Sequence, residues 1–168
     1  GKLYHLKGYE IPEAGRTAKG TAIVNLLQLD NGEKISAVIP ISNFAEGKYL
    51  LMGTKNGLIK KTALSEYVSS RKTGLLAITL KEDDELIDVR LTDGEDNVVM
   101  VTKKGMSITF DEKDVRPMGR TAQGVIGIRL EEDDQVVGME SIITGGKATL
   151  LAITENGFGK RTELEEYR

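Results

Sequence analysis

Residues 50–62 decide the fold, and they run Leu-Leu-Met-Gly-Thr-Lys-Asn-Gly-Leu-Ile-Lys-Lys-Thr. An apolar run ends at Thr54, a Lys-Asn-Gly turn follows, and a second extended run begins at Leu58. Asn56 and Gly57 tolerate the positive φ that tight turns need. The stretch therefore predicts two short strands joined by a turn.

The same pattern recurs along the chain. An apolar run and a Thr-x-x-Gly turn also precede Gly105 and Gly157, and the segment after Gly1 resembles the segments that follow these glycines. We call the four the repeat glycines: Gly1, Gly57, Gly105 and Gly157. Repetition at about 50 residues predicts an array of similar structural units. The predicted units are residues 1–56, 57–104 and 105–156, with a stub at 157–168.

Each unit contains runs with strand character. In the second unit we expect strands at Leu58–Thr62, Leu75–Leu80, Leu86–Leu91 and Asn97–Thr102. Ile87, Val89 and Leu91 alternate with polar residues, which is typical of a strand with one buried face. Single helical turns are expected near residues 62–67 and 162–167.

Four short strands per unit predict an all-β, propeller-like array of four-stranded antiparallel blades, forming an incomplete ring of about three blades. One or two antiparallel sandwiches are the alternative, because sandwiches also contain evenly spaced strands.

Composition excludes several classes of protein. The 168 residues contain no cysteine and one histidine, and the formal net charge is −3. A disulfide scaffold, a cysteine-ligated metal and a thiol nucleophile are excluded. We expect His5 to face solvent on a strand and the acidic runs at 82–85 and 131–134 to be solvated turns rather than metal sites. No apolar run reaches the length of a membrane span, so we expect a soluble, intracellular protein.

Cations recur at fixed places in the units. An arginine opens each of three segments that we call the basic elements, residues 16–20, 71–74 and 120–124, and paired cations flank the repeat glycines. A basic edge separated from an acidic edge suits phosphate binding, whereas a mixed, solubilising surface is the alternative. The candidate DNA-binding residues are Arg16, Lys19, Lys60, Lys61, Arg71, Lys72, Lys103, Lys104, Arg120, Lys160 and Arg161.

Several segments resemble one known family. Residues 11–20, 23–29, 91–96, 115–120, 124–130 and 156–162 are similar to the C-terminal domain of DNA gyrase A, from the gyrase and topoisomerase IV family. The resemblance covers essentially the whole chain. It implies a β-pinwheel that binds duplex DNA through phosphates on a basic perimeter, without reading sequence.

The resemblance also implies a wider role. By bending DNA, such a domain would support ATP-dependent negative supercoiling by a bacterial, cytoplasmic, nucleoid-associated holoenzyme. Its partners would be the rest of gyrase A and the gyrase B ATPase, with no membrane partner. No catalytic residue and no metal or cofactor site are expected in this chain, since ATP and Mg would be used elsewhere in the holoenzyme.

One departure concerns the family's hallmark heptapeptide, Gln-Arg-Arg-Gly-Gly-Lys-Gly, which is absent from this sequence. In the family it lies in the first blade, upstream of the stretch similar to residues 1–6. The three basic elements look like its degenerate counterparts, so we expect a chain truncated at both ends. The equivalent domain of topoisomerase IV, a protein-binding propeller scaffold and a stand-alone enzyme are the alternative functions.

Overall fold

Three β-hairpins turn at three of the repeat glycines, Gly57, Gly105 and Gly157. The computed structural model describes residues 1–69, 73–145 and 147–167. Within these ranges every paired strand is antiparallel, and the helical segments are short 3-10 turns. The prediction of an all-β chain is confirmed.

The strands are β1 (Lys2–Leu3), β2 (Tyr49–Thr54), β3 (Leu58–Ala63), β4 (Leu75–Leu76), β5 (Leu86–Thr92), β6 (Asp96–Thr102), β7 (Ser107–Asp111), β8 (Val125–Ile126), β9 (Val136–Ile143), β10 (Thr149–Ile153) and β11 (Gly159–Glu163). The 3-10 turns are η1 (Gly8–Glu10), η2 (Ile23–Asn25), η3 (Leu64–Tyr67), η4 (Glu112–Asp114) and η5 (Leu164–Glu166). The turns expected near residues 62–67 and 162–167 are thus present as η3 and η5.

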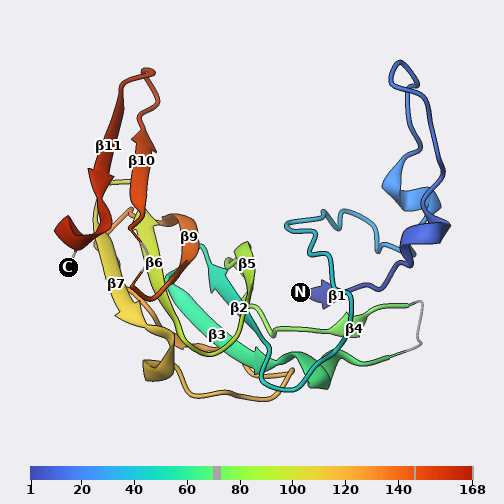
Figure 1. Ribbon diagram of the computed structural model, residues 1–168, viewed down its shortest axis with the longest axis horizontal. Coiled ribbons are helices and arrows are strands. Elements are labelled where there is room, and N and C mark those ends of the chain that lie inside the picture. Colours follow the sequence, from blue (N-terminus) through green and yellow to red (C-terminus); the bar gives the residue numbers. More distant parts are fainter. Residues whose placement is uncertain (70–72, 146, 168) are drawn as a thin grey trace.

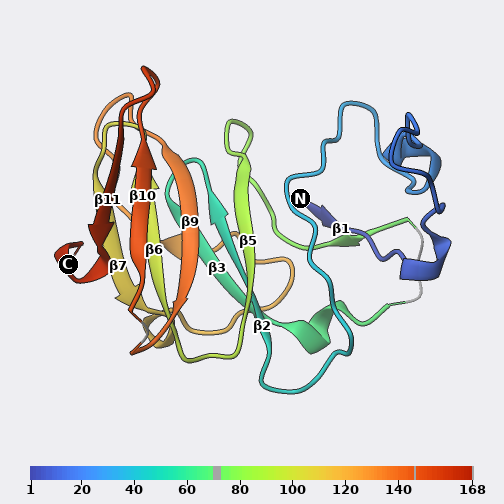
Figure 2. The ribbon, with the colours of Figure 1, turned by 45° about the horizontal axis from the view of Figure 1, so that its top comes forward.

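The strands form four sheets. Their orders are β5-β2-β3-β8, β7-β6-β9, β1-β4 and β10-β11. The sheets follow one another along an open arc, with the N-terminal loops at one side and the β10–β11 hairpin at the other (Figures 1 and 2). Each repeat glycine after the first lies at a hairpin turn inside a sheet, so the sequence units are offset from the sheets.

A hydroxyl shapes each hairpin turn. Thr54 Oγ1 accepts the N–H of Leu58 at 3.1 Å, and the N–H of Gly57 reaches Thr54 O at 3.1 Å. Thr102 and Thr154 accept the N–H of the residue four positions later in the same way. The repeat glycines at these turns have φ of 81–86°. The repeated Thr-x-x-Gly pattern is therefore a local turn structure closed by its own threonine.

The acidic runs hold these turns rather than being only solvated. Asp84 Oδ1 accepts the N–H groups of Asn56 and Glu85, each at 2.9 Å. Asp134 does the same for Lys104 and Gln135. Asp84 is only 6% exposed, so the expectation of a fully solvated turn is wrong at this residue. A buried carboxylate persists there because it satisfies backbone donors.

Short strands from later segments complete earlier sheets. β8 pairs with β3 in the register Leu58↔Ile126, and Gly57 O accepts the N–H groups of Gly127 and Ile128. β4 pairs with β1 in the same way, in the register Lys2↔Leu76. Consecutive units are therefore hydrogen-bonded to one another as well as packed together.

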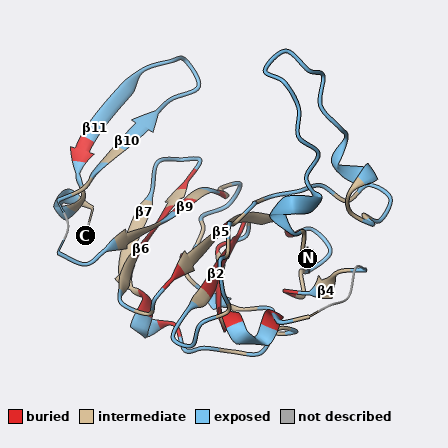
Figure 3. Cartoon of the chain, turned by 45° about the vertical axis from the view of Figure 1, so that its right-hand side comes forward, coloured by how far each residue is buried: buried red, intermediate tan, exposed pale blue. Residues whose placement is uncertain are grey.

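The core lies on both faces of the β5-β2-β3-β8 sheet. Leu51 and Ile59 face the β7-β6-β9 sheet, where they meet Val98, Met100 and Met139. On the other face, β2 packs against η3 and the segment after β4, in a cluster of Leu50, Met52, Leu64, Tyr67, Ala77, Ile78 and Val89. Buried residues concentrate in the central sheets, while the N-terminal loops and the β10–β11 hairpin are mainly exposed (Figure 3).

The sheets approach closely where small residues allow it. A Cβ on Gly53 of β2 would lie 2.9 Å from Met139 Sδ of β9, so a side chain there would have to displace the Met139 thioether. An ion pair spans the same junction, since Arg90 Nε of β5 donates to Glu140 Oε1 of β9 at 2.7 Å. This hydrogen bond is the main cause that lowers the pKa of Glu140 from its ordinary value.

Three expectations about local structure are wrong. Between residues 4 and 48 the structure contains only two 3-10 turns, so the first predicted unit does not form a four-stranded blade. Strands need hydrogen-bonding partners, and no described segment pairs with that stretch. The run 75–80 forms a strand only at Leu75–Leu76. His5 is half-buried, with its ring centroid 5.4 Å from that of Phe44.

No helix in the described part of the chain is long and apolar enough to cross a membrane.

Candidate nucleic-acid interface

The third basic element is fixed to the unit before it. Thr79 Oγ1 donates to Thr121 O at 2.7 Å, and the N–H of Thr79 donates to Ala122 O at 3.3 Å. The Arg120 Nη1 group donates to Leu76 O at 3.3 Å. The element is therefore held through its backbone and through its arginine side chain, and its partners are Leu76 in β4 and Thr79 just after β4.

A glycine is required where this element crosses β3. Gly124 has φ of 103°, and a Cβ there would lie 2.7 Å from Ile59 O. Any side chain would clash with the backbone, because real Cβ atoms do not approach an oxygen so closely. The arginine-to-glycine spacing thus has a geometric cause. Gly124 allows the element to contact the β3 backbone closely, and Arg120 stays half-buried nearby.

Lys60 was predicted as a DNA contact, but its position is internal. The side chain is 0% exposed, and its ammonium donates to the carbonyl oxygens of Ala77, at 2.5 Å, and of Arg120. Burial, together with the charge of Arg120, lowers the pKa of Lys60 to about 8. A fully covered ammonium cannot meet a phosphate in this conformation, so we leave Lys60 out of the phosphate-binding set.

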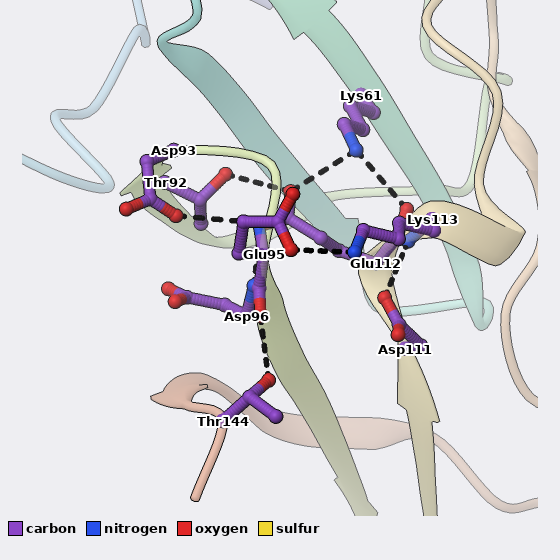
Figure 4. A network of polar contacts seen from close by, with 9 residues as sticks. All are labelled: Lys61, Thr92, Asp93, Glu95, Asp96, Asp111, Glu112, Lys113 and Thr144. Carbon is purple, nitrogen blue, oxygen red and sulfur yellow. Dashed lines mark hydrogen bonds and ion pairs between the residues drawn. The ribbon is translucent and has the colours of Figure 1, made fainter.

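Lys61 is also buried, on the opposite face of the same strand. Figure 4 shows its ammonium directed at Glu112. Its ammonium lies 3.2 Å from Glu112 Oε2 and donates to Glu112 O at 3.1 Å. Thr92 Oγ1 and the N–H of Asp96 donate to the Glu112 carboxylate, each at 2.8 Å. Lys61 is thus the partner of a buried carboxylate, and we leave it out of the set as well.

The same network contains three neighbouring carboxylates. Asp93, Asp96 and Glu112 could bring ligand atoms within 4.8 Å of one another. Both oxygens of Glu112 already accept hydrogen bonds, and Lys61 supplies a positive charge. Burial and the two nearby carboxylates raise the pKa of Asp96 from its ordinary value. The group is therefore a hydrogen-bonded junction between β5, β6 and η4.

The first and second basic elements differ in what the structure describes. Arg16 and Lys19 are exposed, and Gly20, which ends their element, has φ of 78° with nothing within 4 Å of an added Cβ. Arg71 and Lys72 lie outside the described residues. The glycine that ends their element, Gly74, rests against Tyr4, whose Cε1 would be 2.8 Å from an added Cβ.

The paired cations at the repeat glycines have unlike surroundings. Lys103 and Lys104 are exposed, but Lys104 lies against the second acidic run, where its ammonium donates to Glu132 O at 2.5 Å. The expected separation of basic and acidic edges is therefore wrong at this pair. Lys160 and Arg161 are exposed on β11, where no carboxylate forms an ion pair with them among the residues described.

Two exposed arginines beside the third element escaped the sequence analysis. Arg116 precedes the element and Arg129 follows β8, and both side chains are exposed. Neither recurs at the same place in another unit, since the position equivalent to Arg129 is Thr79. Repetition was the signal that selected the other cations, so it could not find these two.

Comparison with known proteins gives concordant results. A family model described as "DNA gyrase C-terminal domain, beta-propeller" matches residues 1–42, 48–93, 96–143 and 148–168. The chain is 47% identical to DNA gyrase A of Salmonella typhimurium, over 99% of its own length and 19% of that protein's. It is 45% identical to DNA gyrase A of Haloquadratum walsbyi, over 100% and 20% respectively. The chain thus spans about a fifth of the length of these relatives.

Solved structures agree with the family match. The C-terminal domain of DNA topoisomerase IV is similar with a TM-score of 0.86 and 35% identity, covering 95% of this chain and 50% of that one. A DNA gyrase A C-terminal domain is similar with a TM-score of 0.78 and 31% identity, covering 96% and 50%. Together with glycine-anchored basic elements on antiparallel sheets, these matches establish that the chain belongs to the family of DNA gyrase C-terminal, beta-propeller domains.

Proposed function

We propose that this chain binds duplex DNA through backbone phosphates, without reading sequence. The observation that carries the proposal is its similarity, over essentially the whole length, to DNA gyrase A proteins. Phosphate contacts position DNA and carry no base information, so cations on anchored loops suit this task. The proposed contacts are Arg16, Lys19, Arg71, Lys72, Lys103, Lys104, Arg120, Lys160 and Arg161.

Charge distribution supports binding by local clusters rather than by net charge. The chain carries 23 Lys and Arg against 26 Asp and Glu. Several carboxylates are engaged inside the fold, as with Glu112 and Asp84. The exposed cations of the first basic element and the half-buried Arg120 of the third therefore meet fewer competing carboxylates than composition suggests. Local fields of this kind attract a polyanion despite a negative net charge.

In the whole protein we propose the role of a non-catalytic wrapping module of DNA gyrase A. By bending DNA it would support ATP-dependent negative supercoiling by a type II topoisomerase. ATP, Mg and the catalytic groups would then belong to other parts of the assembly, which includes the rest of gyrase A and the gyrase B ATPase. We place this assembly in the bacterial cytoplasm, on the nucleoid.

A salt titration of duplex binding tests the proposal. If about six phosphates are neutralised, the log–log slope of affinity against salt is about −5, and affinity falls on the order of 10³-fold between 50 and 200 mM salt. Two duplexes of equal length and unrelated sequence should bind alike. Binding that does not weaken with salt, or that favours one sequence strongly, would contradict the proposal.

A second candidate is the equivalent role in topoisomerase IV, which the TM-score of 0.86 favours. The two differ in what the bound DNA does. Closing a relaxed plasmid with ligase over the chain measures any shift in linking number. If the chain wraps DNA as proposed for gyrase, the linking number of the closed plasmid shifts in one direction. If the chain binds DNA without wrapping it, the linking number does not change. Because this chain lacks the hallmark heptapeptide and its sheets form an open arc, we expect binding with little shift.

A further inference from the structure

We infer that Lys60 is a positioning residue for DNA binding, which holds the third basic element so that Arg120 meets a phosphate while Lys60 itself touches no DNA. The inference rests on the proposed function. It gives a role to a buried cation that phosphate binding alone does not use.

The geometry makes Lys60 a link between three segments. The lysine belongs to β3, and its ammonium donates to Ala77 O just after β4 and to Arg120 O at the start of the third basic element. Tyr67 Oη also donates to Ala77 O, at 3.2 Å, which fixes the first of these acceptors. The backbone of Arg120 is therefore held by a buried cation, and its side chain by Leu76 O.

The surroundings of this ammonium are unusual for a buried charge. Among the described residues, the charged group that acts on its pKa is Arg120, another cation. Within residues 1–69, 73–145 and 147–167, Lys60 forms no ion pair with a carboxylate. Its hydrogen bonds go to carbonyl oxygens instead. A phosphate arriving at Arg120 would supply the missing negative charge nearby.

Packing alone does not require a lysine at this position. Tyr4 stands three residues after its repeat glycine, as Lys60 does, and it packs on Gly74, the glycine that ends the second basic element. In the corresponding place, Lys60 Cβ lies 3.4 Å from a Cβ built on Gly124. An aromatic ring thus fills the equivalent site without a charge. The charge at Lys60 therefore has a purpose besides filling space.

Repulsion between Lys60 and Arg120 links DNA binding to protonation. Burial, and to a smaller extent the charge of Arg120, disfavours the charged state of Lys60 and lowers its pKa to about 8. A phosphate bound at Arg120 offsets the repulsion and favours the charged lysine. Binding of duplex DNA near pH 8 is therefore accompanied by proton uptake, which a purely structural lysine on a remote face would not produce.

A double-mutant cycle in the 168-residue chain tests the inference. The variants are Lys60→Met, Arg120→Ala and the double substitution, and duplex affinity is measured at several salt concentrations. Each single change should weaken binding on the order of fivefold to tenfold and reduce the salt slope by about one. The double variant should bind no more weakly than Arg120→Ala, because Lys60 acts through Arg120.

The control is Glu112→Gln, which disturbs the buried pair on the opposite side of β3 and should lower stability without changing affinity or salt slope. Calorimetry at pH 8 in two buffers of different ionisation enthalpy measures proton uptake, which should be present in the unaltered chain and lost in Lys60→Met. If Lys60→Met does not melt cooperatively, Lys60→Gln, which keeps two N–H donors without charge, replaces it.

The outcomes separate this inference from the proposed function. A chain that does not bind duplex DNA, or an Arg120→Ala variant that binds normally, overturns the proposed role of the element and the inference with it. If Arg120→Ala weakens binding while Lys60→Met leaves affinity and proton uptake unchanged, the inference alone is overturned. Additive losses in the double variant would also overturn it, because they would mean that Lys60 acts independently of Arg120.

Discussion

Asp84 accepts the backbone N–H of Asn56 at 2.9 Å, although 28 residues separate them in the chain. Asp134 and Lys104 have the same relationship at 3.0 Å, over 30 residues. In both cases a carboxylate from an acidic run binds the residue just before a repeat glycine. The hairpin turn of one sheet is thus held by the segment that leads into its next strand.

Removing the Asp84 carboxylate should destabilise the chain. In Asp84→Ala the N–H groups of Asn56 and Glu85 lose two partly buried hydrogen bonds to a carboxylate, and the loss should cost about 1–3 kcal/mol. Chemical denaturation measures the loss. Asp83→Ala is the control, since Asp83 is exposed in the same run and should change stability by less than about 0.5 kcal/mol. Equal effects of the two substitutions would show that the bridge to Asn56 contributes nothing.

Two repeat glycines should differ in their tolerance of a side chain. Both have positive φ, 86° at Gly57 and 84° at Gly105. A Cβ on Gly57 would lie 2.5 Å from Ile128 O, whereas nothing lies within 4 Å of a Cβ on Gly105. Gly105→Ala should therefore cost about 1 kcal/mol from backbone strain alone, and Gly57→Ala clearly more. Melting temperatures that fall equally in both variants would contradict the close approach of residue 128.

The Lys61–Glu112 pair should behave as a buried ion pair. Lys61→Met leaves the Glu112 carboxylate, which is 0% exposed, without its cation and should cost about 3–5 kcal/mol. Adding Glu112→Gln should recover part of this loss, because the double variant contains no unpaired buried charge. Urea denaturation of the singles and the double gives the coupling free energy. A double variant whose loss equals the sum of the singles would exclude the pairing.

Lys60 should make stability depend on alkaline pH. Its pKa in the folded chain is about 8, below the ordinary value of 10.5, so between these values the unfolded chain binds more protons. The free energy of unfolding should then rise by about 2 kcal/mol from pH 8 to pH 10, relative to Lys60→Met. Denaturation curves at several pH values measure the difference. A difference that stays flat across this range would mean that Lys60 titrates normally.

Arg71 and Lys72 should contribute to DNA binding through charge alone. Replacing both by alanine should make the salt slope shallower by about one to two and weaken unrelated duplexes equally. Lys113→Ala is a suitable comparison, because Lys113 is exposed and paired with Glu95 at 2.5 Å, and it should leave the slope unchanged. An unaltered slope in the double variant would remove the second basic element from the proposed interface.

Strand positions in the second unit were predictable because local pattern and burial agree there. The run ending at Leu91 alternates and the run ending at Thr102 is continuously apolar, as in half-buried and buried strands, and each finds a partner. Positive φ at Gly57, Gly105 and Gly157 was predictable from Lys-Asn-Gly and similar turns. What local pattern could not supply was the partner of each strand. The run 75–80 illustrates this, because it becomes a strand only at the two residues that lie beside β1.

The candidate site was harder to predict, because sequence shows which residues are cationic but not where they point. Lys60 and Lys61 are adjacent, and on a strand adjacent side chains lie on opposite faces. One face of β3 meets the third basic element and the other meets Glu112. Both lysines are therefore internal, although a Lys-Lys pair after a turn is typical of an exposed surface. Exposed Arg116 and Arg129 escaped notice since they do not repeat.

The pairing of β3 with β8 has a consequence for synthesis of the chain. β5 ends at Thr92, and the two residues that complete its sheet, Val125 and Ile126, emerge only after β6, β7 and η4 have been made. At about 5–20 residues per second, the ribosome needs about 2–7 s for that stretch. During this interval the β3 edge exposes unpaired backbone groups beside apolar side chains, a surface that can recruit foreign strands. The rate of translation between residues 92 and 126 thus sets how long a nascent chain is open to misassembly.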